Sequence, residues 1–458
     1  MKRQKVLRGD CLEVLKNLPD NSVDAVVTDP PYGLGTVKST KRLLKAWMRG
    51  EDGSEAVGKS GFMGKNWDAC VPPPVLWEEV LRVLKPGGFL LVFSGTRTQD
   101  LMGLALRLAG AQPRNVCAWV YSQGFPKSVD VSKMIDKELG AERKKIRYEA
   151  RRCNNPKSIG SGHGIEGGDR PWMKKAQEVG YHEADDNTPV SPEAQQWDGW
   201  QSDLKPAFEP ILMMRKPPSE KTLAANILKW GTGGINADAC RIGNETLPAQ
   251  HAGKARIGTF ENEGAYTPER TGRFPSNLML DETMARVIDE QTGYSKSAKL
   301  NTIQQARKGQ HSKGDEKARV RIEEGYDDDG FGSRFFYVAK ASPSERSLGL
   351  EDWCDHPTMK PIELMRYLVR MVTHKDGVVL DPFCGSGTTG CACAIEGFKF
   401  MGIEQSKKFV NVARQRIKYF KEHKHQYVKK MKIVEAAKDV KATPAFARTL
   451  FTRDADEK

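Results

Sequence analysis

The chain of 458 residues lacks the sequence features of exported proteins, membrane-spanning proteins and small metal-binding modules. Its nine cysteines form no Cys-x-x-Cys pair, so we expect neither a disulfide framework nor a regular zinc site. No run approaches the roughly 18 apolar residues that a spanning helix needs. No apolar signal-peptide core follows the basic residues at the start. We therefore expect a cytoplasmic protein without a metal site or a membrane span.

Positive charge, by contrast, is in excess. The chain contains 72 Lys and Arg against 59 Asp and Glu, which gives a formal net charge of +13. A hydrophobic content of 38% is enough for a substantial core, and the length suggests about one to three domains. A basic globular protein of this kind attracts polyanions, so the charge favours nucleic acid as a partner.

Strand and helix patterns alternate at both ends of the chain, which is typical of an α/β fold with a mostly parallel sheet. The N-terminal part predicts a helix at Cys11–Leu18, a strand at Val23–Thr28, a helix at Pro74–Leu84, a strand at Phe89–Phe93, a helix at Leu101–Ala109 and a strand at Val116–Tyr121. The C-terminal part predicts a helix at Pro361–Thr373, a strand at Gly377–Leu380, a helix after Gly390, a strand at Phe398–Ile403 and a helix at Lys407–Lys421.

Two long polar stretches separate these patterned ends. The first begins with a lysine-rich, helix-like segment from Ser128 to Arg152 and continues in Gly, Ser, Asn and acidic residues to Gln196. An apolar strand at Pro210–Arg215 follows, and a second Gly-rich stretch then runs from Pro217 to about Phe331. We interpret the polar stretches as insertions into the α/β core, and we expect the basic tail to be loosely held.

The sharpest motif is Asp29-Pro30-Pro31-Tyr32, which directly follows the strand at Val23–Thr28. Strand carboxyl ends are where α/β sheets place ligand-binding residues. An exocyclic amine becomes a nucleophile when its two N–H groups are accepted, and the Asp29 carboxylate and the Pro30 carbonyl could accept one each. The two prolines stiffen the loop, and Tyr32 offers a ring for stacking on an extruded base. The alternative is a rigid Pro-Pro turn without a catalytic role.

A second motif, from Val378 to Gly390, consists of a strand, a glycine loop and the start of a helix. Gly385 and Gly387 let the backbone approach a ligand, and Glu404 at the end of the next strand can accept hydrogen bonds from two ribose hydroxyls. The pattern predicts a nucleoside cofactor. A dinucleotide enzyme would also fit the glycines, but too few residues follow Gly390 for the rest of such a domain unless the domain is permuted.

These motifs together resemble the β-class of DNA amino-methyltransferases, and phage and prophage members above all. The resemblance covers roughly residues 4–128, 197–240 and 332–420. Besides the two motifs above, it is carried by Gly9-Asp10-Cys11, Phe62, Trp67-Asp68, Lys85-Pro86-Gly87-Gly88, Gly124-Phe125-Pro126-Lys127, Lys205-Pro206, Glu209-Pro210 and His356-Pro357-Thr358-Met359-Lys360-Pro361.

The resemblance implies a circularly permuted, Rossmann-like methyltransferase core that uses S-adenosylmethionine and contains an inserted target-recognition region. The implied parts are a catalytic half at 1–128, an insertion at 129–203, a core strand at 204–216, a target-recognition region at 217–331, a cofactor half at 332–425 and a basic tail at 426–458. In this arrangement Thr28–Asp29 and Leu380–Asp381 would end adjacent parallel strands, so that methyl donor and target base meet.

The resemblance also implies roles for single residues. The catalytic motif would be Asp29, Pro30, Pro31 and Tyr32. The cofactor would contact Asp381, Phe383, Gly385 and Gly387 in its pocket, Glu404 at its ribose, Asp10 at its adenine amino group, and Thr358 and Lys360 near its methionine end. Each has a simpler alternative, because Asp10 or Thr358 could cap a helix and Lys360 could be a solvated charge.

The implied activity is methylation of adenine N6 on a flipped base of double-stranded DNA. Cytosine N4 methylation stays open because both amines present the same local chemistry, although Asp-Pro-Pro-Tyr accompanies adenine more often. Cytosine C5 methylation is disfavoured, since that reaction uses a cysteine after proline and the chain has no Pro-Cys pair. An RNA or protein methylase is less favoured, and an inactive DNA-binding module is the alternative of another class. A homodimer and a partner endonuclease are also left open.

Basic residues in the two insertions are candidates for DNA contact. Those of the first insertion are Arg143, Lys144, Lys145, Arg147, Arg151 and Arg152, which could instead form a solvated helix face. Trp197 and Trp200 of the same insertion could pack in the protein or stack on DNA. Those of the second are Arg241, Arg256, Arg270, Arg273 and Lys313, within Gly-rich loops suited to reading a groove.

Overall fold

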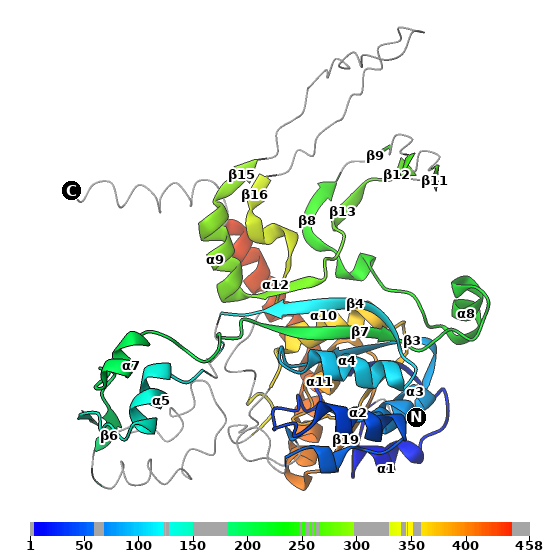
Figure 1. Cartoon of the computed structure of the whole chain (residues 1–458). Helices are drawn as coiled ribbons and strands as arrows, with labels where there is room; N and C mark the ends of the chain where they lie inside the picture. The colour runs from blue at the N-terminus through cyan, green and yellow to red at the C-terminus, as the bar shows by residue number, and fades with distance from the viewer. Residues whose placement is uncertain are drawn as a thin grey trace, which may run out of the picture. The chain divides into compact units, whose positions relative to one another are not determined.

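The computed structural model divides the chain into two compact units, Met1–Asn236 with Ala339–His425, and Ala237–Val338 with Gln426–Lys458 (Figure 1). Each unit is described by itself. The structure describes residues 4–58, 68–122, 124, 128–149, 179, 181–247, 250–251, 256–257, 260–261, 266–296, 329–339, 345, 347–350 and 359–441.

The core strands of the larger unit lie in one sheet, in the order β1-β19-β18-β2-β3-β7-β4. Their bounds are β1 Gln4–Arg8, β2 Val23–Thr28, β3 Leu84–Phe93, β4 Gln112–Val120, β7 Phe208–Arg215, β18 Val378–Asp381 and β19 Lys399–Glu404. The strands from β1 to β3 in this order are parallel, whereas β7 runs antiparallel to both β3 and β4. The sheet therefore brings elements from the start, middle and end of the chain together, as the alternating pattern predicts.

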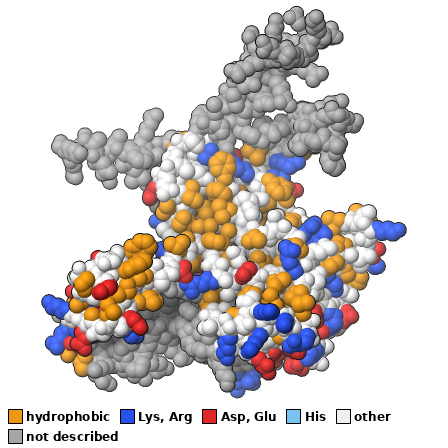
Figure 2. Space-filling model, viewed as in Figure 1, with side chains coloured by type: hydrophobic (Ala, Val, Ile, Leu, Met, Phe, Trp, Pro, Cys, Tyr) orange, Lys and Arg blue, Asp and Glu red, His pale blue; other side chains and the backbone are white. Residues whose placement is uncertain are grey.

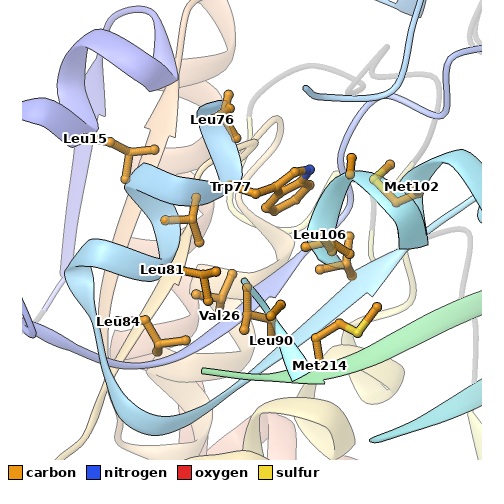
Figure 3. Close-up of a cluster of buried hydrophobic side chains, with 14 of the residues drawn as sticks. Leu15, Val26, Leu76, Trp77, Leu81, Leu84, Leu90, Met102, Leu106 and Met214 are labelled. Carbon is orange, nitrogen blue, oxygen red and sulfur yellow. The ribbon is translucent and has the colours of Figure 1, made fainter. Parts of the chain in front are cut away.

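Helices cover both faces of this sheet. The row α1 (Cys11–Lys16), α3 (Pro74–Val83) and α4 (Gln99–Leu108) packs on one face, where Trp77 and Leu90 belong to a buried cluster (Figure 3). Successive residues of a strand face opposite sides of the sheet. Val26 and Val27 are equally buried, so both faces of the sheet must be covered at this point. Val26 belongs to the first cluster, and α10 (Ile362–Val372), which packs on α11 (Thr388–Glu396), contacts β2.

A polar contact joins the central strands at the edge opposite to their carboxyl ends. The buried Asp24 of β2 accepts hydrogen bonds from Lys85 Nζ of β3 at 2.6 Å and from the backbone N–H of Val378 in β18 at 2.7 Å. His374 Nε2 lies 3.1 Å from the same carboxylate. One buried carboxylate therefore ties three neighbouring strands together, and its partners offset the cost of its burial.

Three elements differ from the sequence-based expectation. The segment Lys85–Gly88, between the predicted helix and the predicted strand, lies within β3, which begins at Leu84; the register with β2 shifts there, and the Gly87 N–H donates to the Lys216 carbonyl beyond β7. The helix α12 (Lys407–Lys441) continues well past the predicted end at Lys421. The predicted helix from Ser128 to Arg152 contains α5 (Val131–Glu138), and a strand at Lys145–Glu149 follows it instead.

The first insertion forms its own small cluster of elements. It contains α5, β5 (Lys145–Glu149), β6 (Tyr181–Asp185) and α7 (Pro192–Gln196), with β5 and β6 antiparallel. Arg143 is buried and ion-paired with Asp136 at 2.7 Å, so its predicted contact with phosphate is wrong. Arg147 pairs with Glu183, and Arg151 and Arg152 lie outside the described residues. Figure 2 shows hydrophobic side chains gathered over α5 and α7.

The smaller unit consists of short strands, the helix α9 and the C-terminal part of α12. Its elements are β8 (Ile242–Leu247), β9 (Gln250–His251), β10 (Arg256–Ile257), β11 (Phe260–Glu261), β12 (Tyr266–Thr267), β13 (Arg270–Arg273), β14 (Leu278–Asp281), α9 (Glu282–Thr292), β15 (Tyr294–Lys296), β16 (Asp329–Phe331) and β17 (Tyr337–Ala339). The candidate DNA contacts Arg241 and Arg273 pair with Asp238 and Glu245, and Lys313 lies outside the described residues.

The other helices of the larger unit are short. They are α2 (Thr40–Met48) and α8 (Leu223–Trp230), with a single 3-10 turn at Ser54–Ala56, while the smaller unit has 3-10 turns at Asp238–Cys240 and Gly332–Phe335. Among the helices in the described ranges, none has the length and apolar character needed to span a bilayer. Within the same ranges, no three His, Cys, Asp or Glu side chains gather in a way that could hold a metal ion.

Candidate active site

The two motifs predicted from the sequence meet at one edge of the sheet. The parallel strands β2 and β18 are hydrogen-bonded neighbours, with Leu380 opposite Val26. The chain leaves β2 at Thr28 and enters the catalytic motif at Asp29, and it leaves β18 at Asp381 and enters the glycine loop. The expectation that these strands are adjacent and parallel is confirmed.

Asp381 holds the glycine loop against the neighbouring strand. Its Oδ1 accepts hydrogen bonds from Thr28 Oγ1 at 2.7 Å and from the Phe383 N–H at 3.1 Å, and its Oδ2 accepts one from Thr389 Oγ1 at 2.6 Å. Burial raises the pKa of Asp381 to about 6 despite these hydrogen bonds. Asp381 is buried and both of its oxygens accept hydrogen bonds from the protein, so it holds the glycine loop in place.

The glycine loop approaches α12 closely because Gly387 has no side chain. Gly385 and Gly387 both have positive φ, and a Cβ on Gly387 would lie 2.8 Å from the Cβ of Ala413. The Gly385 N–H donates to Glu404 Oε2 at 3.0 Å, and the Ser406 N–H donates to Oε1 at 2.8 Å. Each carboxylate oxygen keeps a free lone pair, so Glu404 is oriented by the backbone and can still accept a hydroxyl.

Asp10 lies beside Glu404 and caps a helix. Its Oδ1 accepts the backbone N–H groups of Leu12 and Glu13 at the start of α1, at 3.0 and 3.3 Å. Its Oδ2 accepts the side-chain amide of Gln405 at 2.7 Å. The capping alternative is therefore confirmed, and contact with a cofactor adenine stays a prediction. Thr358 lies outside the described residues, so its predicted role stays a prediction too.

The catalytic motif is joined to the C-terminal part of the chain by a buried ion pair. Lys360 Nζ donates to Asp29 Oδ2 at 2.6 Å and lies 3.2 Å from Glu209 Oε2, with 7% of the lysine side chain exposed. The alternative of a solvated Lys360 charge is therefore wrong. Burial alone would lower the pKa of Lys360, but the carboxylates of Asp29 and Glu209 raise it above its ordinary value. Lys360 is therefore a cation held between two anions.

The second oxygen of Asp29 has no hydrogen-bond partner among the described residues. Asp29 Oδ1 is buried and accepts no hydrogen bond from any residue in the described ranges. A buried carboxylate oxygen left in this state costs free energy, on the order of 1–3 kcal/mol or more for a charged group. Such an atom is what a site would present to an N–H donor that arrives with a substrate.

Tyr32 is held by Glu209, which is not among the site residues predicted from the sequence. Its hydroxyl donates to Glu209 Oε2 at 2.7 Å, and Lys360 Nζ lies 5.4 Å from its ring centroid. Burial, followed by the nearby charges of Asp29 and Glu209, raises the pKa of Tyr32 well above its ordinary value. Glu209 precedes Pro210 in a segment that carries the family resemblance, which is the only sequence signal for its presence here.

Pro30, Pro31 and the residue after Tyr32 form a tightly supported loop. Pro30 is buried, and Pro31 is partly exposed. Gly33 has φ of +67°, and its N–H donates to Asp68 Oδ1 at 3.0 Å. A Cβ at Gly33 would lie 2.4 Å from the Val71 backbone nitrogen, so only glycine fits. The loop that carries Asp29 is therefore anchored at both ends.

Comparison with known families identifies the chain. A family model described as DNA methylase, that of the N6 and N4 methyltransferases, matches residues 23–415. The chain belongs to this DNA methylase family. The match includes both motifs, the central strands and Lys360. S-adenosylmethionine is the methyl donor of the family, and the described site fits a nucleoside cofactor through the cramped Gly387 and the oriented Glu404 carboxylate.

Individual relatives of this DNA methylase match either a short segment closely or the whole chain weakly. The DNA adenine methyltransferase YhdJ of Escherichia coli is 34% identical over 68 residues, 15% of this chain and 23% of that protein. The type II methyltransferase M.HindIII of Haemophilus influenzae is 20% identical over 429 residues, 90% of this chain and 94% of the relative.

Among solved structures, the cytosine-N4-specific PvuII DNA methyltransferase shares 14% identity and a TM-score of 0.38, with 93% of each chain covered. The matched segments span only 22% to 26% of the first curated relatives of this DNA methylase. These short matches leave the activity of the whole protein to be inferred from its own site.

Proposed function

We propose that this DNA methylase transfers a methyl group from S-adenosylmethionine to adenine N6 of a flipped base in double-stranded DNA. The observation that carries the proposal is the buried Oδ1 of Asp29, which accepts no hydrogen bond from a described residue and lies at the edge where the catalytic motif meets the glycine loop. A target amine would donate one N–H to this oxygen and the other to the Pro30 carbonyl. Both acceptors are in place before the substrate arrives, so little reorganisation is needed.

Lys360 prepares Asp29 for this role. The ammonium group of Lys360 occupies Oδ2, which leaves Oδ1 as the acceptor for the target amine. S-adenosylmethionine supplies an electrophilic methyl group, and the residues of this chain hold the amine in line with it. No covalent bond to the protein is required, which agrees with buried cysteines such as Cys384, whose pKa burial raises well above its ordinary value.

The cofactor would lie along the carboxyl ends of β18 and β19. Glu404 would accept the ribose hydroxyls, Gly385 and Gly387 would border the pocket, and the partly exposed Phe383 would form an apolar wall. Asp10 would contact the adenine amino group while capping α1. Asp381 would act by holding the loop, and Lys360 and Thr358 would lie near the methionine end.

The flipped base would stack on Tyr32. Extrusion of a base from a duplex costs a few kcal/mol, which stacking and the contacts to Asp29 and Pro30 would offset. Adenine is favoured over cytosine because Asp-Pro-Pro-Tyr accompanies adenine methylation more often in the family resemblance. The short match to an adenine methyltransferase supports the same choice.

The domain roles are part of the proposal. Residues 1–128 and 332–425 would be the catalytic and cofactor halves in permuted order, and residues 217–331 would read the DNA target. The enzyme would act in the cytoplasm as a modification methylase of the restriction type or of a phage. Residues 129–203 carry an exposed apolar surface, and three of their described basic residues, Arg143, Lys145 and Arg147, pair with acidic ones.

One experiment tests the function directly. The purified protein is incubated with S-adenosylmethionine and unmodified DNA, the DNA is digested to nucleosides, and the products are identified by mass spectrometry. N6-methyladenine is expected, and mapping its positions gives the recognition sequence. N4-methylcytosine would overturn the choice of base, while DNA binding without any methylated product would favour an inactive DNA-binding module.

A further inference from the structure

We infer that Glu209 is a positioning residue of the methyl-transfer site, which holds Tyr32 and Lys360 in place around Asp29. Its Oε2 accepts the Tyr32 hydroxyl at 2.7 Å and lies 3.2 Å from Lys360 Nζ. One carboxylate oxygen therefore connects the stacking ring with the counter-ion of the catalytic carboxylate. The inference rests on the proposed methyl transfer and assigns to it a residue outside the catalytic motif.

The contact with Lys360 explains why one oxygen of Asp29 stays free. An ammonium group has three N–H donors and could approach both oxygens of a single carboxylate. Here Glu209 attracts the same ammonium from a second direction, and Lys360 contacts Asp29 through Oδ2 while Oδ1 accepts no hydrogen bond from the described part of the chain. Without the Glu209 charge, Lys360 would turn toward Asp29 and compete with the target amine for Oδ1.

Aromatic rings complete the cage around the ammonium. Lys360 Nζ lies 5.4 Å from the ring centroid of Tyr32 and 5.0 Å from that of Phe93, at the end of β3. The Tyr32 ring therefore lies near the Lys360 ammonium, and its hydroxyl is hydrogen-bonded to Glu209. Together these two contacts restrict rotation of the ring. A ring fixed in this way is a better stacking platform than one that must be ordered when the base arrives.

The backbone of Glu209 is held by strands on both sides. In the sheet it lies opposite Trp119 of β4, and the next residue, Pro210, accepts the Ser94 N–H at 2.9 Å beyond the end of β3. Because β7 runs antiparallel to its neighbours, the start of β7 lies at the edge where β2 and β3 end. The carboxylate therefore projects from a rigid element, as precise placement of a side chain requires.

Two isosteric variants separate the contacts. Glu209→Gln keeps the size of the side chain but removes the charge that balances Lys360, and Tyr32→Phe removes only the hydroxyl. We expect Glu209→Gln to lower kcat by about 10- to 100-fold and Tyr32→Phe by about 3- to 10-fold, with cofactor affinity within about twofold of wild type. The double variant should be about as slow as Glu209→Gln alone, because both changes break one shared network.

The pH dependence of kcat distinguishes a positioning role from a general loss of structure. The titratable groups that face Lys360 are Asp29, Glu209, Tyr32 and Tyr121. In Glu209→Gln, the Asp29 carboxylate is the one carboxylate left to offset the cost of burying the Lys360 charge. The pKa of Lys360 therefore falls. An alkaline decline of kcat should appear in Glu209→Gln at a pH at which wild type and Tyr32→Phe keep their full kcat.

A matched control uses the same substitution on a surface ion pair. Glu220→Gln removes the carboxylate that pairs with Lys229 at 2.6 Å, and wild-type kinetics are expected. Wild-type kcat without this alkaline decline in Glu209→Gln would overturn the inference. A wild-type protein that methylates no DNA would instead overturn the proposed function. Crystal structures of wild type and Glu209→Gln test the inference in either case, because unchanged positions of Tyr32 and Lys360 would overturn it.

Discussion

The Thr28 hydroxyl donates a hydrogen bond to the Asp381 carboxylate at 2.7 Å, between residues that are 353 positions apart in the chain. The bond connects β2, which leads into the catalytic motif, with β18, which leads into the glycine loop. Thr389, at the start of α11, donates to the other oxygen at 2.6 Å. All three side chains are buried, so the loop that begins at Asp29 and the glycine loop share one hydrogen-bonded support.

This support makes stability depend on pH. Burial raises the pKa of Asp381 from an ordinary 3.8 to about 6, so between these values the folded protein holds a proton that the unfolded chain releases. The stabilisation is present below about pH 4 and is lost as the pH rises through 6, by about 3 kcal/mol. Urea unfolding at several pH values measures the free energy of unfolding. Over this pH range it should fall in wild type relative to Asp381→Asn, which has no carboxyl group to titrate. A difference between the two proteins that stays constant from about pH 4 to pH 7 would contradict the raised pKa.

Replacing Asp29 should separate catalysis from cofactor binding. Asp29→Ala removes the acceptor for the target amine but leaves Glu404 and the glycine loop intact. We expect methyl transfer to fall by more than tenfold, which corresponds to more than about 1.4 kcal/mol, and cofactor affinity to stay nearly unchanged. A transfer assay and calorimetry measure the two quantities. A variant that keeps more than about a tenth of the wild-type rate would show that Asp29 is not the acceptor.

Replacing Glu404 should have the opposite effect. Glu404→Ala removes the proposed acceptor for the ribose hydroxyls and also releases the Gly385 N–H, so S-adenosylmethionine should bind at least about tenfold more weakly. Titration calorimetry measures the affinity, and Glu138→Ala, at an exposed position near the end of α5, serves as the control. Equal affinity in wild type and Glu404→Ala would remove Glu404 from the ribose site.

Salt should weaken DNA binding steeply. A protein with a net charge of +13 that contacts a duplex neutralises several phosphates and releases their counterions. We expect the affinity to fall by at least about tenfold between roughly 50 and 200 mM salt, and the slope of log affinity against log salt gives the number of phosphates contacted. Fluorescence anisotropy with a labelled duplex measures it. A flat dependence would indicate that duplex DNA is not the substrate.

Local patterns in the sequence predict much of the core. The strand at Val23–Thr28 is found as predicted, because a continuous apolar segment can be buried on both faces of a parallel sheet. The predicted helices before and after it differ from the observed ones mainly at their ends, where caps and tertiary contacts decide. The family resemblance also placed Asp29 and the glycine loop together, since parallel strands end at the same edge.

The sequence by itself determined the elements and the kinds of residue at the site, whereas the tertiary structure alone decided which residues meet there. Lys360 and Asp29 are 331 positions apart, and Tyr32 and Glu209 are 177 apart. Glu209 reaches the site only because β7 enters the sheet antiparallel between β3 and β4. Local propensity favours a strand without setting its direction or its neighbours, since those depend on packing between distant segments.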